Sequence, residues 1–297
     1  MAVKTVQATI NGQVYNLTLN SSTGKYEATI TAPSKSSYNQ SGHYYGVSVK
    51  ATDDAGNVTT KDAADATLGS SLRLQVKEKV APVITITYPT ASAFITNANP
   101  KIAWKVTDDD SGVNPDTIAL TVDGKAVTAA DITKTAVSGG YECSYTPKTA
   151  LGDGEHTITA TASDYDGNAA SAKSVTFTVD TIPPTLNVTS PAEGLVTNQS
   201  SLTVAGTTND VTSKPVTVTV NGSSVTVNSD GSWSKTITLT NGNNTITIVA
   251  TDRAGKTTTV TRTVKLDTGA PVIKSVTLTP NPVDAGRTFV ISVEVTD

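Results

Sequence analysis

The chain has 297 residues, and its 22 Lys and Arg against 26 Asp and Glu give a formal net charge of −4 at pH 7. This balance argues against a nucleic-acid-binding protein, because binding phosphates requires a basic face. A single cysteine and two histidines exclude an internal disulfide framework and a Cys-based zinc site.

Threonine is unusually frequent, with 54 residues. Because threonine loses rotamer freedom in a helix and suits a pleated strand, the composition predicts an all-β protein. Residues 1–10 run directly into an alternating strand pattern, without the features of a secretory signal peptide. If Met1 is the native start, we expect the protein to be made and kept in the cytoplasm, or to leave it by a route other than a signal peptide. The alternative is a cloned fragment with an added start codon.

Three tight turns punctuate the alternating strands. Each is an Asn-Gly or Asp-Gly pair that follows apolar residues at alternate positions, which is the strongest short-range signal for a β-hairpin. The pairs are Asn11-Gly12, Asp123-Gly124 and Asn221-Gly222.

A second motif also occurs three times, each time after an alternating strand. It reads ATDDAGN at 51–57, ASDYDGN at 162–168 and ATDRAGK at 250–256. Its glycine supplies the positive-φ position of a turn. We expect its aspartate to accept hydrogen bonds from backbone amides across that turn.

A leading proline marks the start of each later repeat, at Pro82, at Pro183-Pro184 and at Pro271. Proline cannot donate to a central ladder, so it suits a linker or the first residue of a strand. Segments of about 80 to 100 residues with about seven short strands match an immunoglobulin-like β-sandwich. We therefore predict an all-β rod of tandem immunoglobulin-like domains at residues 1–80, 81–181 and 182–268, followed by a two-strand half-repeat at 269–297.

Two segments carry a family resemblance. Residues 82–180, with Trp104 to Asp108 and Asp110 to Pro115, resemble a bacterial immunoglobulin-like (Big-type) repeat. Residues 184–266 resemble another subtype, with LTVAG at 202–206, VTVNG at 218–222 and NTITIVATD at 244–252. Such tandem repeats occur in phage tail or capsid-decoration proteins, in bacterial surface adhesins and in the stalks of carbohydrate-active enzymes.

The two ends of the chain look like complementary parts of one domain. Ile291 to Asp297 corresponds to Ile102 to Asp108, and each segment ends 26 residues after its leading proline. The first domain, by contrast, reaches its Asn-Gly turn at residue 11, so we expect it to lack its first two strands. We predict that residues 271–297 complete a partner domain, such as the first domain of another copy. A frayed tail, edge strands on the third domain and truncation by cloning remain alternatives.

The resemblance implies a structural or attachment role and no enzymatic activity. The missing signal peptide favours a phage or prophage virion component, on the tail or capsid exterior, that forms a homo-oligomer through its terminal strands and contacts host-surface polysaccharide. We expect no nucleic-acid partner and no membrane insertion. The alternatives are a fragment of a bacterial surface adhesin, at the cell surface or extracellular, and a spacer of a secreted carbohydrate-active enzyme.

No residue set predicts a catalytic, cofactor-binding or metal site. Asp108 to Asp110, Asp164, Asp166 and Asp180 are interpreted as solvated turn carboxylates. Calcium is the alternative, because Asp164 to Asn168 resembles the start of a calcium loop, although no bidentate glutamate follows.

Other reactive residues have simpler explanations. Glu142 could pair with Asp153 or Glu155 as the acid and base of a glycosidase, but isolated carboxylates in turn-rich sequence are expected to be solvated. Cys143 alternates with tyrosines in a strand and is predicted to be a small core or face residue. Trp104 and Trp233 are predicted to pack inside sandwiches, with exposure of Trp233 for sugar stacking as the alternative. The threonine-rich faces at 236–240 and 257–263 are predicted to face solvent.

Overall fold

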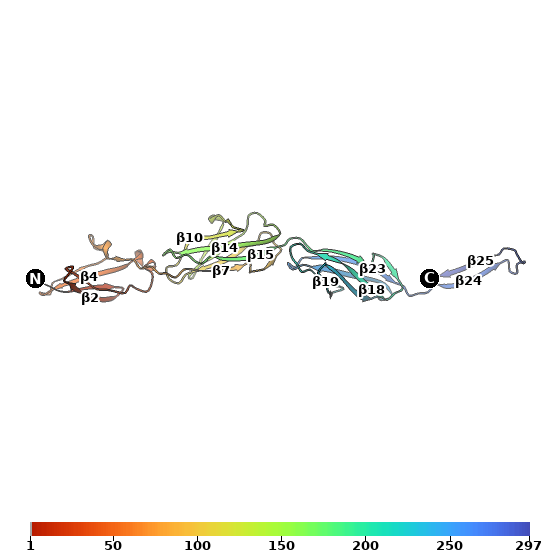
Figure 1. Cartoon of the computed structure of the whole chain (residues 1–297), viewed down its shortest axis with the longest axis horizontal. Coiled ribbons are helices and arrows are strands. Elements are labelled where there is room, and N and C mark those ends of the chain that lie inside the picture. The colour runs from red at the N-terminus through yellow and green to blue at the C-terminus, as the bar shows by residue number, and fades with distance from the viewer. Residues whose placement is uncertain (1) are drawn as a thin grey trace. The chain divides into compact units, whose positions relative to one another are not determined.

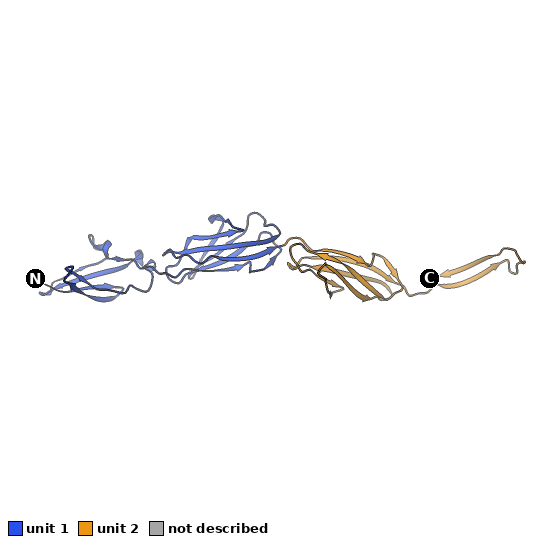
Figure 2. Ribbon diagram, viewed as in Figure 1, with its two compact units in different colours: residues 1–179 blue, residues 180–297 orange. Residues whose placement is uncertain are grey.

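The computed structural model describes residues 2–297 and consists of strands joined by turns and four short 3-10 helices. It divides into two compact units, residues 1–179 and 180–297 (Figure 2). Among the residues that it describes, no helix is long and apolar enough to cross a bilayer. The predicted all-β class, built from tandem immunoglobulin-like sandwiches, is confirmed.

The second domain is a complete two-sheet sandwich within the first unit (Figure 1). One sheet has the order β12-β13-β9-β7 and the other β11-β10-β14-β15-β8. All pairings are antiparallel except that of β8 with β15. The elements are β7 (Val83–Tyr88), β8 (Phe94–Ile95), β9 (Ile102–Thr107), β10 (Val113–Val122), β11 (Lys125–Ala126), η4 (Ala129–Asp131), β12 (Thr133–Val137), β13 (Gly140–Tyr145), β14 (Gly154–Asp164) and β15 (Lys173–Val179).

Alternate residues of both sheets fill the core of this sandwich. Trp104 on β9 is 2% exposed and packs in one cluster with Phe177 on β15 and Ile158 on β14. Because strand side chains alternate between faces, β9 follows a strict pattern of buried and half-buried residues. The prediction that Trp104 packs between the sheets is confirmed.

The third domain repeats this topology in the second unit. Its sheets have the orders β16-β18-β21 and β17-β23-β22-β19-β20, and β17 pairs in parallel with β23. Trp233 on β21 is 2% exposed inside the core, so it is not available for sugar stacking. The strands are β16 (Thr185–Ser190), β17 (Leu195–Thr197), β18 (Ser201–Asn209), β19 (Thr217–Val220), β20 (Ser223–Val225), β21 (Ser232–Thr238), β22 (Gly242–Thr251) and β23 (Thr257–Leu266).

The first domain has a single sheet of order β3-β2-β1-β4-β5, with β6 paired to β4. Its inward-facing residues correspond to core residues of the second domain, yet Val47, Val49 and Ala51 are only half-buried. Within residues 2–80 no second sheet covers this face. The elements are β1 (Val3–Ile10), β2 (Gln13–Asn20), β3 (Lys25–Glu27), η1 (Ser37–Asn39), η2 (Ser41–His43), β4 (Tyr45–Asp53), β5 (Val58–Lys61), η3 (Gly69–Leu72) and β6 (Arg73–Leu74).

The C-terminal segment is an isolated hairpin of β24 (Val272–Thr279) and β25 (Val290–Thr296). Every residue of both strands is exposed, including Ile273 at 64% and Val290 at 62%. Two strands alone cannot bury an apolar face, so this hairpin needs further cover to be stable.

The predicted turns form as expected. Asn11, Asp123 and Asn221 have φ near +50°, and the glycine after each also has positive φ, as a type I′ turn requires. The motif aspartates accept backbone amides across their turns: Asn57 N lies 2.8 Å from Asp53, Asn168 N lies 2.7 Å from Asp164, and Lys256 N lies 2.8 Å from Asp252.

The Asp123 turn also holds a histidine. The two nitrogens of His156 lie 2.8 Å from Asp123 Oδ2 and 2.7 Å from the Gly152 carbonyl oxygen. Burial opposes protonation of His156, but its bonds to the Gly152 carbonyl and the Asp123 carboxylate raise its pKa above the usual value. Burial likewise opposes ionisation of Asp123, yet the contact with His156 keeps the pKa of Asp123 lowered.

We predict that Gly206→Ala destabilises the third domain. A Cβ at Gly206 on β18 would lie 2.2 Å from the Asn187 carbonyl oxygen and 2.5 Å from Trp233 Cζ2. Overpacking of this kind costs about 1–3 kcal/mol. Urea unfolding followed by tryptophan fluorescence measures the loss. Gly152→Ala, whose Cβ meets nothing within 4 Å, should unfold like the unchanged chain, and equal behaviour of the two variants would contradict the argument.

We also predict a pH dependence of the second domain's stability. The raised pKa of His156 stabilises the fold fully below its unfolded value of 6.5, and this stabilisation is lost as pH rises through the folded pKa. The lowered pKa of Asp123 contributes above its unfolded value of 3.8 and is lost as pH falls through the folded pKa. Urea unfolding at pH about 5 to 9 should show a decline that His156→Gln flattens and His43→Gln does not. An unchanged slope in His156→Gln would refute the assignment.

Candidate functional site

Acidic residues occur at three matching positions around the start of the second and third domains. One lies four residues before the leading proline (Pro82 or Pro184), and one lies 26 residues after it. The third is the aspartate of the recurring turn motif. In the second domain these residues are Glu78, Asp108 and Asp164, and in the third they are Asp180, Asp210 and Asp252.

The fold explains why residues so far apart in the sequence meet. Asp108 directly follows β9 in one sheet, whereas Asp164 ends β14 in the facing sheet. Glu78 lies in the segment that leads into β7. One oxygen from each carboxylate lies within 4.8 Å of the other two. In the third domain Asp210 follows β18, Asp252 follows β22, and Asp180 precedes β16, and one oxygen of each again lies within 4.8 Å of the other two.

In the first cluster hydrogen bonds hold all three carboxylates. Asp108 Oδ1 accepts the Gly112 amide at 2.7 Å, and Glu78 Oε1 accepts the Ser111 amide at 2.7 Å. Asp164 Oδ2 accepts the side-chain amide of Asn168 at 2.6 Å. The cluster therefore fastens the linker residue Glu78 to the turns at one end of the second domain.

Further contacts reach from this end into the first domain. Asp110 accepts the Ser36 amide through both carboxylate oxygens at 3.1 Å, and Asp166 accepts the Glu78 amide at 3.0 Å. The rings of Tyr38 and Tyr165 stack with their centroids 4.1 Å apart. Hydrogen bonds and one aromatic stack thus join the two domains of the first unit.

The expectation that these carboxylates are solvated was wrong for three of them. Asp108, Asp164 and Asp180 are 8%, 2% and 0% exposed. They are buried because their oxygens accept the amides of tight turns, which replaces hydration with protein hydrogen bonds. Sequence reasoning missed Glu78, Asp210 and Asp252 as members of the clusters. The shared spacing from the leading proline is the signal that could have found Glu78 and Asp210, and the recurring turn motif is the one that marks Asp252.

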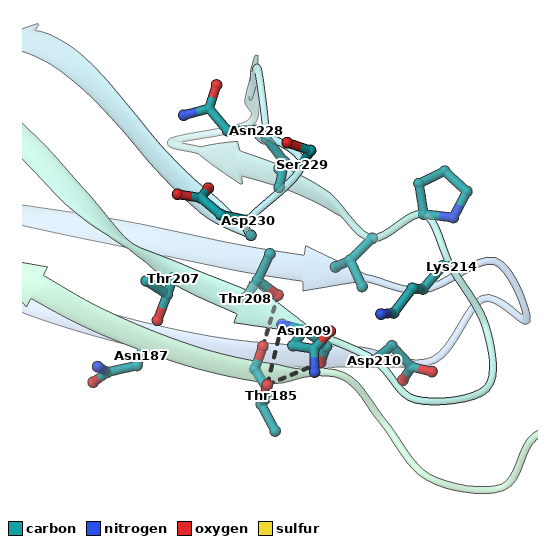
Figure 3. Close-up of a pocket in the computed structure, with 14 residues that line it drawn as sticks. Thr185, Asn187, Thr207, Thr208, Asn209, Asp210, Lys214, Asn228, Ser229 and Asp230 are labelled. Atoms are coloured by element: carbon teal, nitrogen blue, oxygen red, sulfur yellow. Dashed lines mark hydrogen bonds between the residues drawn. The ribbon is translucent and has the colours of Figure 1, made fainter.

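A polar groove of about 710 Å³ lies beside the second cluster (Figure 3). Figure 3 shows Asp210 and Lys214 at one end of the groove and Asn187 and Thr207 towards the other. In the groove wall Thr185 of β16 is joined to Asn209 of β18, since the Thr185 hydroxyl donates to the Asn209 carbonyl oxygen at 2.8 Å. Within residues 2–297, no aromatic side chain lines this groove, so it offers hydrogen bonds to a ligand and no surface on which a sugar ring could stack.

The residues weighed for catalysis do not come together. Glu142 is exposed on β13, whereas Glu155 is exposed on β14 of the opposite sheet. Because facing sheets pack about 10 Å apart and both side chains point outward, the two carboxyls lie on opposite surfaces. Cys143 is buried, and its burial raises the pKa of its thiol to about 11, which disfavours the reactive thiolate.

The threonine-rich strands behave as predicted. On β23 the residues at 257, 259, 261 and 263 are exposed threonines, and Thr236, Thr238 and Thr240 are exposed around β21. These positions cover the outer faces of the sheets and leave the inner faces to apolar side chains.

Two family models match the chain. Residues 82–160 match the bacterial Ig domain, and residues 184–268 match domain B of glucodextranase. Both segments fold as two-sheet sandwiches. The second and third domains are therefore tandem immunoglobulin-like domains of bacterial type.

Two curated relatives share part of the sequence. Bacillopeptidase F of Bacillus subtilis (strain 168) is 34% identical over 141 residues, which cover 48% of this chain and 9% of that protein. Chitinase ChiA of Flavobacterium johnsoniae is 28% identical over 204 residues, which cover 63% of this chain and 12% of that protein. The chain thus spans about a tenth of the length of the curated relatives that it matches.

Solved structures with tandem domains are more distant. The fibronectin(III)-like modules of Clostridium thermocellum CbhA are 18% identical with a TM-score of 0.39, over 62% of this chain and 94% of theirs. A tetra-tandem repeat from the extending region of a large adhesion protein is 22% identical with a TM-score of 0.33, over 98% and 79% of the two chains. With TM-scores this low, the assignment depends on the family models and the strand topology.

Proposed function

We propose that this chain is a non-catalytic spacer, a run of immunoglobulin-like domains that separates or positions other domains of an extracellular protein. The observation that carries the proposal is how its polar side chains are used. The carboxylates of the first cluster accept turn amides, Asp110 and Asp166 hold the first domain to the second, and Cys143 is buried. These groups maintain turns and linkers, and none of them faces a partner suited to acid–base or nucleophilic chemistry.

The comparisons support an extracellular setting more than a virion. The family model that matches the third domain is named after a domain of glucodextranase, and the two curated relatives are named as a peptidase and a chitinase. The matched segments make up only about a tenth of each of these relatives, which suits an accessory part of a longer protein. The virion role inferred from the sequence has no such support and stays a prediction.

The spacer proposal predicts no hydrolysis of chitin oligosaccharides, dextran or casein by the purified chain. Product release that disappears in Glu142→Gln or Glu155→Gln would overturn it.

A spacer also requires domains that fold independently. Gly206→Ala should therefore lower the unfolding transition reported by Trp233 and leave that reported by Trp104 in place, whereas a joint shift would count against separate modules.

We further propose that two copies of this chain associate through the sheet of the first domain and the C-terminal hairpin, each of which has an uncovered face within residues 2–297. The first domain presents an apolar face on β4, with half-buried Val47, Val49 and Ala51, that Leu68 and Leu72 flank but no second sheet covers within residues 2–80. The hairpin of β24 and β25 matches the position of β7 and β9, which cover the corresponding face in the second domain. A hairpin from a second copy therefore supplies what the first domain lacks.

Mixing two truncated chains tests this association. One variant lacks residues 269–297 and the other lacks residues 1–80, so neither can associate with further copies of itself. Mixed together, the two variants should form a one-to-one complex, which light scattering measures. Val49→Asp, on the apolar face of β4, should abolish the complex, and Lys50→Asp, on the opposite face, should not. Monomers at all concentrations would overturn the proposal and leave both faces for a different partner.

A further inference from the structure

The second acidic cluster differs from the first in what its oxygens contact. Asp180, Asp210 and Asp252 are 0%, 6% and 6% exposed, and their carboxylates approach within 4.8 Å of one another. One oxygen of each is held by backbone amides. Asp180 Oδ1 accepts the Ile182 amide at 3.2 Å, Asp210 Oδ1 accepts those of Thr212 and Ser213 at 2.7 and 2.6 Å, and Asp252 Oδ1 accepts that of Lys256 at 2.8 Å.

The remaining oxygens of two of these carboxylates have no protein partner. Asp180 Oδ2 and Asp252 Oδ2 are buried without a hydrogen bond. The hydroxyl of Ser213, three residues after Asp210, is also unpartnered, as is that of Ser111 at the equivalent position beside the first cluster, so the two carboxylate oxygens are what set the second cluster apart. Buried polar atoms are normally satisfied, and buried carboxylates close together repel one another. The arrangement therefore requires a positive group that these residues do not themselves provide.

The first cluster shows what the second one lacks. There the side-chain amide of Asn168 occupies Asp164 Oδ2 at 2.6 Å. The equivalent position in the third domain, four residues after the motif aspartate, is Lys256. The backbone amide of Lys256 donates to Asp252 Oδ1, and Asp252 Oδ2 is left without a partner. No oxygen of Glu78, Asp108 or Asp164 is buried without a partner among residues 2–297.

We propose that Asp180, Asp210 and Asp252 bind one Ca²⁺ ion at the start of the third domain. Calcium is a hard cation that takes six to eight oxygen ligands at about 2.3–2.6 Å, so oxygens on one ion lie up to about 5 Å apart. Three converging carboxylates fit this chemistry. Magnesium is bound through fewer protein ligands and keeps its water, and zinc prefers nitrogen or sulfur, which these three residues do not offer.

The position of the site gives the ion a structural effect. Asp210 follows β18 in one sheet of the sandwich, Asp252 follows β22 in the other, and Asp180 belongs to the segment that leads into β16. An ion shared by all three links the two sheets and the preceding segment at one end of the domain. Calcium therefore stabilises the third domain and fixes its leading segment.

Calorimetric titration of the full chain with CaCl₂, after treatment with EGTA, tests the proposal. The unchanged chain should bind calcium, and Asp252→Asn or Asp210→Asn should weaken binding at this site by more than about tenfold, because a charged ligand is lost. Asp230→Asn removes a carboxylate from an exposed turn of the same domain and should bind as the unchanged chain does. No binding heat, or equal losses in Asp230→Asn and Asp252→Asn, would overturn the proposal.

Thermal unfolding separates an ion site from a structural role of the aspartates. In a Trp104→Phe background, Trp233 is the remaining tryptophan and reports the third domain. Calcium should raise its melting temperature by several degrees, magnesium should raise it less, and Asp252→Asn should show no calcium effect. In EGTA the same variant should melt at or above the parent temperature, because removing one charge relieves repulsion. A large decrease in EGTA, or an equal effect of magnesium, would contradict a calcium site.

Discussion

The fold depends on one constraint, which is that each sheet has a single apolar face that another sheet must cover. In the second and third domains the facing sheets meet that need, and residues such as Ile158 and Ile248 are fully buried. In the first domain and in the C-terminal hairpin a covering sheet is absent from the residues described, and most of the equivalent apolar positions, such as Val47 and Val49, stay half-buried or exposed. Each Å² of apolar surface that is buried stabilises a fold by about 25 cal/mol, and these two segments do not gain that stabilisation from the residues described.

Sheet pairing also creates the acidic clusters. Strands of the two sheets end at the same edge of the sandwich, so carboxylates that follow β9 and β14, or β18 and β22, meet there although they are tens of residues apart in sequence. At an effective dielectric constant near 20, a pair of unit charges within 4.8 Å of each other repels by at least about 3.5 kcal/mol. That cost must be offset by turn amides, by a side-chain amide such as that of Asn168, or by a cation.

Features that depend on residues close in the sequence were predictable. Features that depend on residues brought together by the packing of two sheets were not. The turns at Asp123-Gly124 and Asn221-Gly222 follow from local backbone preference, and the burial of Trp104 and Cys143 follows from strand alternation. The burial of Asp108, Asp164 and Asp180 escaped prediction, because a turn aspartate looks solvated until the opposite sheet is in place. Glu78 and Asp210 are marked in the sequence only by their shared spacing from the leading prolines, and their role depends on residues of other strands.

The two clusters imply that the starts of successive domains are secured by different chemistry in one chain. At the second domain, protein groups partner the carboxylates, since the Asn168 side-chain amide bonds Asp164, the Ser36 amide bonds Asp110 and the Ser111 amide bonds Glu78. At the third domain, Lys256 replaces the asparagine and two carboxylate oxygens are left without partners. A single amide side chain, present or absent four residues after the motif aspartate, therefore helps to decide whether the buried carboxylate oxygens are all partnered within the protein or need an ion.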